Sequence, residues 1–103
     1  MMDPTKLAEM MRQAQQMQER MQQELAQKIV TGESGGGMVK VVVNGMLEVK
    51  SVKIDVAVID PKDPTLLEDL VRAAVSQALS AVEEARLEHT RSMAGNLGLP
   101  GMF

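Results

Sequence analysis

The fold is decided by the stretch Gly32-Glu33-Ser34-Gly35-Gly36-Gly37-Met38-Val39-Lys40-Val41-Val42-Val43-Asn44-Gly45. Glycine tolerates positive φ, so residues 32–37 predict a tight bend. The β-branched run that follows predicts a strand over residues 38–43. Asn44-Gly45 favours a type I′ hairpin turn. Helical patterns lie on both sides, so the stretch divides the chain into helix, sheet and helix.

Two further strands are expected around this segment. Residues 29–31 follow the first helix directly, and a return strand is expected over residues 47–58. The apolar positions of the return strand change parity between Val49 and Val52. Such a slip by one residue indicates a β-bulge near Ser51. We therefore expect a three-stranded antiparallel meander.

The first helical pattern covers residues 4–28. Asp3 is a good N-cap and Pro4 suits the first helical position. One apolar stripe runs at spacings of three and four, through Leu7, Met10, Met11, Ala14, Met17, Met21 and Leu25. About 25 helical residues give a rod of roughly 37 Å, which is long for so small a domain. The helix is expected to project, or to pair with a second helix in a short coiled-coil seam. The alternative is an amphipathic helix packed on its own sheet.

The second helical pattern begins with Asp63-Pro64, which repeats the cap of the first helix, and Thr65 with Glu68 could form a capping box. It is expected to reach about residues 89–91. The segment after it is rich in glycine, methionine and proline, so residues 1–92 are expected to form one domain and residues 93–103 a flexible tail. Docking of that tail through Met102 and Phe103 is the alternative.

Composition favours a homodimer and a cytoplasmic location. The 103 residues include ten methionines, one phenylalanine and no tyrosine or tryptophan, which leaves a thin core. Sharing a core between two copies would relieve that shortage. The chain has no cysteine, which excludes disulfides and thiolate catalysis. No apolar run approaches the ~20 residues that span a bilayer, so no membrane partner is expected.

No catalytic chemistry is indicated. The glycine-rich bend lacks the Gly-Lys-Ser/Thr of a phosphate loop and enters a strand, unlike a dinucleotide fingerprint. His89 is the only histidine, and with no cysteine beside it we predict no metal site. Adjacent carboxylates on a helix diverge by about 100°, so the Glu83-Glu84 pair does not converge. We predict no catalytic residue, no cofactor, no small-molecule substrate and no enzyme activity.

The basic residues suggest a nucleic-acid partner. They lie on the first helix and near the end of the second, at Lys6, Arg12, Arg20, Arg86 and Arg91. On projecting helices such side chains can contact DNA phosphates. Since single-strand binders stack bases on aromatic rings, the presence of Phe103 as the single aromatic residue favours duplex DNA. The net charge of −3 requires any basic surface to be local, and ordinary solubility charge is the alternative.

Several motifs, taken in order, resemble the YbaB/EbfC family of bacterial nucleoid-associated proteins. They are Met17-Gln18-Glu19-Arg20-Met21-Gln22, the segment from Val30 to Val41, Asn44-Gly45, Val52-Lys53-Ile54-Asp55 and Leu67-Glu68-Asp69-Leu70-Val71. The resemblance implies a homodimer with a central sheet and projecting helices shaped like tweezers. It also implies binding to double-stranded DNA in the cytoplasmic nucleoid. It carries over no list of contact residues.

The sequence thus predicts an α+β domain in the order α-β-β-β-α, with two long helices flanking an antiparallel meander. As a homodimer it would bind duplex DNA with little sequence preference and influence nucleoid organisation and gene expression. The alternative is a protein-interaction module that uses its methionine-rich helix, because methionine side chains adapt to partner surfaces.

Overall fold

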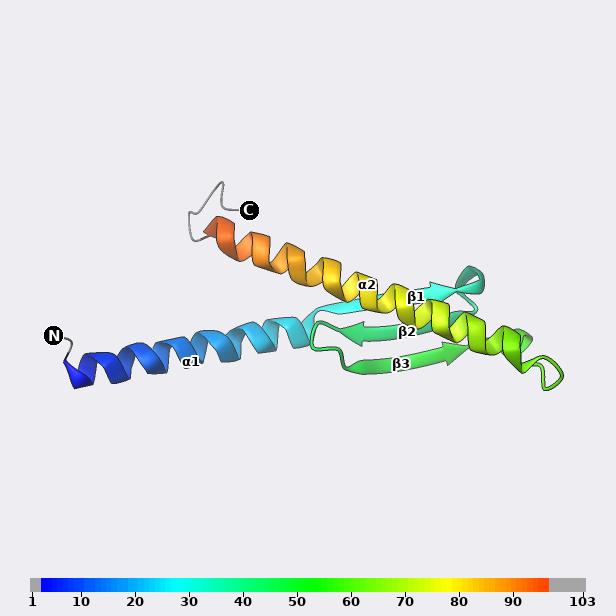
Figure 1. Ribbon diagram of the computed structural model, residues 1–103, viewed down its shortest axis with the longest axis horizontal. Helices are drawn as coiled ribbons and strands as arrows, with labels where there is room; N and C mark the ends of the chain where they lie inside the picture. Colours follow the sequence, from blue (N-terminus) through cyan, green and yellow to red (C-terminus); the bar gives the residue numbers. More distant parts are fainter. Residues whose placement is uncertain (1–2, 97–103) are drawn as a thin grey trace.

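Two long helices and one three-stranded sheet form the part of the chain that the computed structural model describes, residues 3–96 (Figure 1). In chain order the elements are α1 (Pro4–Gln27), β1 (Ile29–Ser34), β2 (Val39–Asn44), β3 (Val49–Ile54) and α2 (Pro64–Asn96). Short 3-10 turns occupy Gly35–Gly37 and Val56–Val58. The molecule is elongated, with principal extents of 72 × 30 × 17 Å. The predicted α-β-β-β-α order is confirmed.

The sheet has the order β1-β2-β3 with antiparallel pairing throughout, as a meander requires. Val42 pairs with Ser51, whereas Val43 pairs with Val49, so Lys50 is the extra residue of a bulge. The bulge expected near Ser51 is therefore confirmed. It returns the apolar side chains of β3 to one face of the sheet despite their change of parity in the sequence.

β3 is shorter than the predicted return strand, which was expected to reach residue 58. The Asp55 side chain accepts a 2.9 Å hydrogen bond from the Ala57 backbone N–H and begins the 3-10 turn Val56–Val58. Because that turn leaves the strand direction, Val58 becomes buried in the core. Local side-chain capping thus ends the strand where β-branched composition alone suggested that it continued.

The type I′ turn predicted at Asn44-Gly45 is wrong. The connection extends from Asn44 to Val49, and the residue with positive φ is Leu47 at 63° rather than Gly45. The Asn44 side-chain oxygen accepts 3.0 Å hydrogen bonds from the backbone N–H groups of Met46 and Glu48. A side chain that binds two following amides favours this longer loop over a two-residue turn.

The core lies between α2 and the strands β1 and β2. It consists of Val39, Val41, Val43, Val58, Ala74, Ala78 and Val82. Small residues on α2 let its backbone lie directly on β1, where a Cβ on Gly32 would come within 2.1 Å of the Ala74 carbonyl oxygen. The bend itself uses the other glycines, since Gly35, Gly36 and Gly37 have positive φ as predicted.

α1 projects away from the sheet. Its cap is the predicted one, with the Asp3 carboxylate accepting a 3.1 Å hydrogen bond from the Thr5 N–H. None of its residues is buried, so packing of α1 on the chain's own sheet is wrong. α2 continues to Asn96, beyond the predicted end at residues 89–91. Residues 97–103 of the predicted tail lie outside the described part. Neither helix of residues 3–96 combines the length and the hydropathy that crossing a membrane requires.

Candidate nucleic-acid interface

The base of α1 is held by the loop between β2 and β3. The Gly45 N–H donates to the Leu25 carbonyl at 2.9 Å, and the Asn44 amide donates to the Ala26 carbonyl at 3.0 Å. These carbonyls belong to the last turn of the helix, which lacks the N–H donors of a following turn; the Lys28 N–H at the C-cap also donates to the Leu25 carbonyl, at 3.1 Å. Asn44 is fully buried and also donates to the Glu48 carboxylate at 2.8 Å. The loop therefore fixes the direction in which α1 leaves the sheet.

α2 joins the same loop through Arg86. Its Nε donates a 2.8 Å hydrogen bond to the Gly45 carbonyl. A Cβ on Gly45 would lie 2.6 Å from the Leu25 carbonyl oxygen, so only glycine fits between the two helices without movement. This group of Leu25, Gly45 and Arg86, which we call the arm anchor, links α1, the loop and α2.

Beyond the arm anchor the two helices run toward the same end of the molecule as separate arms (Figure 1). The Nε2 atom of His89 on α2 lies 3.4 Å from a carboxylate oxygen of Glu24 on α1. This His89–Glu24 contact and a cavity beside it occupy the space where the arms diverge. The N-terminal turns of α1 extend away from both.

The predicted DNA-contact residues of α1 fall into two groups. Lys6 and Arg12 lie exposed on the projecting part of the helix. The Arg12 guanidinium is 3.8 Å from the Glu9 carboxylate, and both side chains are well exposed, so the pair contributes little to stability. Arg20 instead lines the cavity between the two arms.

The two predicted DNA-contact residues of α2 also differ in their surroundings. Arg91 is exposed on the C-terminal part of the helix, beyond the arm anchor. Arg86 has a structural partner in the Gly45 carbonyl. All five residues are exposed, but Lys6, Arg12 and Arg91 lie on the outer parts of the arms, while Arg20 and Arg86 lie nearer to the base where the helices converge.

Sequence reasoning missed two lysines on the sheet. Lys40 and Lys53 are directly opposite each other on β2 and β3, both exposed, on the face turned away from α2. Like charges in such a pair repel each other. The alternation of apolar and basic residues along both strands carried this signal, but only the register shows that the two lysines meet.

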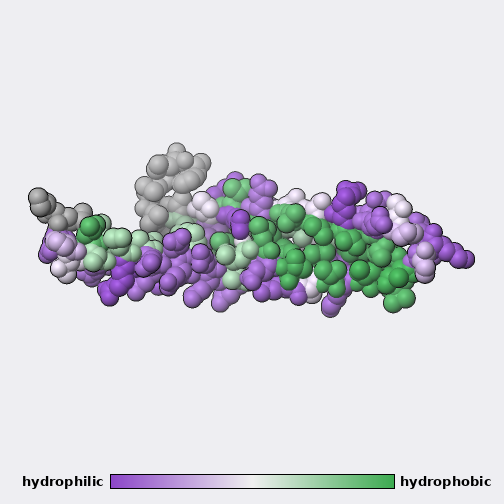
Figure 2. Space-filling model, turned by 60° about the horizontal axis from the view of Figure 1, so that its bottom comes forward, coloured by the Kyte–Doolittle hydropathy of each residue, from purple (hydrophilic) through white to green (hydrophobic). Residues whose placement is uncertain are grey.

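An apolar surface continues past the edge of α2 onto β3. Val52 pairs with Val41, and both side chains lie on the same face of the sheet. Val41 is 2% exposed but Val52 is 51% exposed, because α2 packs on β1 and β2 and leaves β3 uncovered. Ile54, paired with the buried Val39, repeats this pattern. Figure 2, turned to bring the β3 edge forward, shows a broad apolar patch in this region.

The flank of α2 contributes to the same surface. Gln77 binds β1 from one side of the helix, and Arg86 reaches the β2–β3 loop from the other. At about 100° per residue, Val75 and Leu79 fall on the Arg86 side, next to the uncovered strand. Leu79 is 50% exposed. The β3/α2 surface, as we name it, comprises Val49, Val52, Ile54, Val75 and Leu79.

The described residues hold no group of three or more histidine, cysteine, aspartate or glutamate side chains placed to bind a metal ion. What they offer instead is a pair of helical arms with basic side chains and a large apolar surface. The fold and arms define a class of small α+β proteins in which two long helices extend from one meander. An uncharacterized protein from Helicobacter pylori shares this fold with a TM-score of 0.70 at 27% identity, over 90% of this chain and 98% of that one.

Sequence comparisons give the family. A nucleoid-associated protein of Caldanaerobacter subterraneus subsp. tengcongensis is 50% identical over 97 residues, which cover 91% of this chain and 87% of the relative. A nucleoid-associated protein of Paramagnetospirillum magneticum is 46% identical over 100 residues, or 94% of each chain. The family model matches residues 2–97, and the chain belongs to the YbaB/EbfC DNA-binding family. This membership confirms the predicted family and the prediction that the chain is not an enzyme.

Proposed function

We propose that this chain forms a homodimer that binds double-stranded DNA in the bacterial cytoplasm, as part of the nucleoid. Binding is mainly to phosphates, has little sequence preference, and influences nucleoid organisation and gene expression. The observation that carries the proposal is the pair of projecting arms with solvent-exposed Lys6, Arg12 and Arg91, in a chain of a DNA-binding family.

The dimer is supported by the β3/α2 surface. Exposed apolar patches of this extent usually mark an interaction site. A second copy is the occupant we propose, since a twofold contact is self-complementary and covers both patches at once. It also enlarges the core of a chain that has a single aromatic residue. The dimer carries two sets of arms and so doubles the number of phosphate contacts.

Binding through phosphates, with moderate affinity, is supported by the balance of charged residues on α1. α1 carries three basic residues, Lys6, Arg12 and Arg20, against three acidic ones, Glu9, Glu19 and Glu24. Attraction to DNA is therefore local and moderate, with a Kd of about 1–100 μM at physiological salt, as for non-specific binding in general. The exposed glutamines of α1 can add neutral hydrogen bonds to phosphates.

Fluorescence anisotropy with two labelled duplexes of unrelated sequence tests this proposal. We expect similar affinities for both duplexes, weaker binding to single strands, and a steep loss of affinity as salt rises. Absence of duplex binding at low salt would rule the proposal out. A strong preference for one duplex would contradict binding mainly through phosphates, but it would leave the proposal of duplex binding intact.

A protein-interaction module is the second candidate function. It is favoured by the apolar stripe of α1, where Leu7, Met10, Met11 and Met17 are all about half-exposed or more. Methionine side chains adapt readily to partner surfaces. Affinity capture with and without nuclease separates the two functions, because partners held through DNA are lost on nuclease treatment and direct partners are retained.

A further inference from the structure

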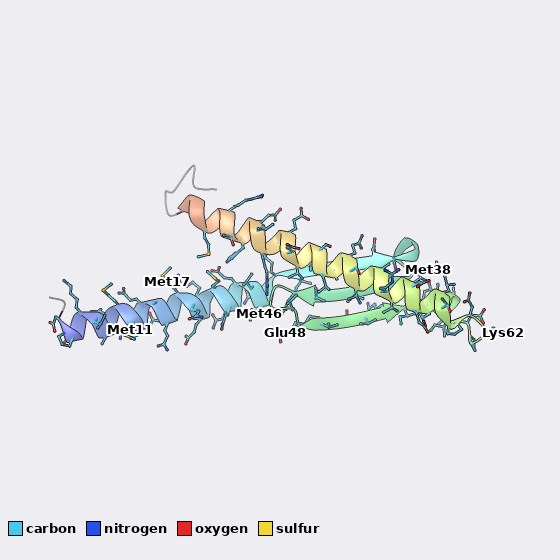
Figure 3. All side chains as sticks on the ribbon, viewed as in Figure 1. Met11, Met17, Met38, Met46, Glu48 and Lys62 are labelled. Carbon is cyan, nitrogen blue, oxygen red and sulfur yellow. The ribbon has the colours of Figure 1, made fainter. Side chains whose placement is uncertain are left out.

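A cavity of about 370 Å³ lies between α1 and α2 where the arms diverge. It is lined by Met17 and Met21 from α1 and by His89 and Met93 from α2. Figure 3 shows Met17 on the side of α1 that faces α2. Arg20 and Glu24 also line the cavity and have opposite charges.

The spacing of these four groups is regular. Met17 and Met21 are four residues apart on α1, and His89 and Met93 are four residues apart on α2. Residues at this spacing lie on one face of a helix, one turn from each other. Each helix therefore contributes two potential donor residues to one cavity, and helix bundles likewise build metal sites from side chains on facing helices.

His89 has an unsatisfied nitrogen in this cavity. Its side chain is 16% exposed, and the Nε2 atom is buried with no hydrogen-bond partner among the described residues. The Glu24 carboxylate lies 3.4 Å from Nε2. In the neutral tautomer that carries its proton on Nδ1, the Nε2 lone pair is free to bind a metal ion in this cavity, and the adjacent Glu24 carboxylate favours a positively charged ligand there.

We propose that this cavity is a binding site for Cu(I), with the sulfurs of Met17, Met21 and Met93 and the Nε2 of His89 as ligands. Thioethers are soft ligands and select Cu(I), whereas Mg²⁺ and Ca²⁺ require oxygen ligands and Zn²⁺ favours thiolates, imidazoles and carboxylates. The four ligands are neutral, so the negative charge that offsets the ion comes from Glu24, while Arg20 adds a positive charge to the cavity wall. A search for histidine and cysteine spacings overlooks such a site because three of its ligands are methionines.

Metal binding would join the two arms. Its ligands come from both helices, so the ion would hold α1 and α2 together above the arm anchor. Because such a site exists only in the folded chain, the metal would also raise the melting temperature.

The experiment uses the full chain without an affinity tag and without DNA, so its outcome is independent of the proposed function. Ag(I) serves as a redox-stable substitute for Cu(I) and is titrated by calorimetry. His89 is the only histidine, so its ring resonances in a proton NMR spectrum identify the site directly. We expect one equivalent of Ag(I) to bind and to shift these resonances.

Matched variants complete the test. Met21→Leu and Met93→Leu keep apolar volume in the cavity and remove one sulfur each, and we expect Ag(I) affinity to fall at least about tenfold. The control Met11→Leu removes an exposed sulfur from the same helix, outside the cavity, and should leave affinity unchanged. Equal binding by all three variants, or binding that leaves the His89 resonances unmoved, would overturn the proposal. A competition titration with a Cu(I) chelator under anaerobic reducing conditions should rank the variants in the same order, and a different order would equally contradict it.

Discussion

The Nε of Arg86 donates a 2.8 Å hydrogen bond to the carbonyl of Gly45, whose own N–H donates to the Leu25 carbonyl at 2.9 Å. One peptide segment thus connects the last turn of α1 with the middle of α2. Because α1 has no buried residue of its own, this connection is what gives the projecting arm a defined direction. Arg86 therefore has a structural role in addition to the DNA contact predicted from its charge.

Replacing Arg86 should lower stability. The change Arg86→Ala leaves the Gly45 carbonyl without its donor, and we expect the free energy of unfolding to fall by about 1–3 kcal/mol. Arg91→Ala removes the same charge from an exposed position and should change it by no more than about 0.5 kcal/mol. Urea denaturation followed by far-ultraviolet circular dichroism measures both variants at one protein concentration. Equal free energies of unfolding for the two variants would show that the Arg86 hydrogen bond of the arm anchor contributes nothing to stability.

Gly32 should be the glycine least tolerant of a side chain. Gly32→Ala places a Cβ 2.1 Å from the Ala74 carbonyl oxygen and 2.3 Å from the Ala78 nitrogen, both backbone atoms of α2. The helix must move away from β1, and we expect a loss of about 3 kcal/mol or more. Gly36→Ala is the control, since its Cβ would meet no atom within 4 Å and the cost is only that of its φ of 68°, about 1–2 kcal/mol. Similar losses in the same denaturation measurement would contradict direct packing of α2 on β1.

These glycines show what the sequence could predict of the fold. A run of glycines before a β-branched strand predicts a bend through backbone conformation alone, and Gly35–Gly37 form it. Gly32 and Gly45 are required because another element approaches their backbone closely, which depends on tertiary packing. Local sequence therefore predicted the order of elements, the bulge and the projection of α1, but not the loop that Asn44 closes.

The β3/α2 surface should control the proposed dimer. Val52→Glu places a charge in the middle of the apolar surface, where burial against a second copy would be costly, so we expect a monomer. Thr31→Glu puts the same charge on an exposed position of β1, on the opposite face of the sheet, and should leave the dimer intact. Size-exclusion chromatography with light scattering gives both masses. A dimeric Val52→Glu variant with unchanged stability would place the dimer interface elsewhere.

The candidate site was only partly predictable. Charge and helix periodicity placed basic residues on two helices, and the structure does place Lys6, Arg12 and Arg91 on the exposed parts of the arms. The settings of Arg20 in the cavity and of Arg86 at the arm anchor depend on how the helices converge. No local pattern contains that information.

Arg12 should contribute to DNA binding through its charge. Arg12→Glu and Lys62→Glu change the net charge equally, but Lys62 lies in the turn before α2, at the end of the molecule opposite to the N-terminus of α1 (Figure 3). We expect Arg12→Glu to weaken binding to duplexes of unrelated sequence by similar factors, and Lys62→Glu to have a much smaller effect. Anisotropy titrations at one salt concentration measure both. If the two variants weaken binding equally, overall charge rather than the arm determines affinity.

The salt dependence of duplex binding tests the role of the arms most directly. The logarithm of the association constant is measured against the logarithm of the salt concentration for the unmodified chain, for Arg12→Glu and for Lys62→Glu. We predict a linear decrease for the unmodified chain, the same slope for Lys62→Glu, and a slope smaller in magnitude by about one unit per lost phosphate contact for Arg12→Glu. Binding that is insensitive to salt, or an Arg12→Glu slope identical to that of the unmodified chain, would contradict phosphate recognition by this arm.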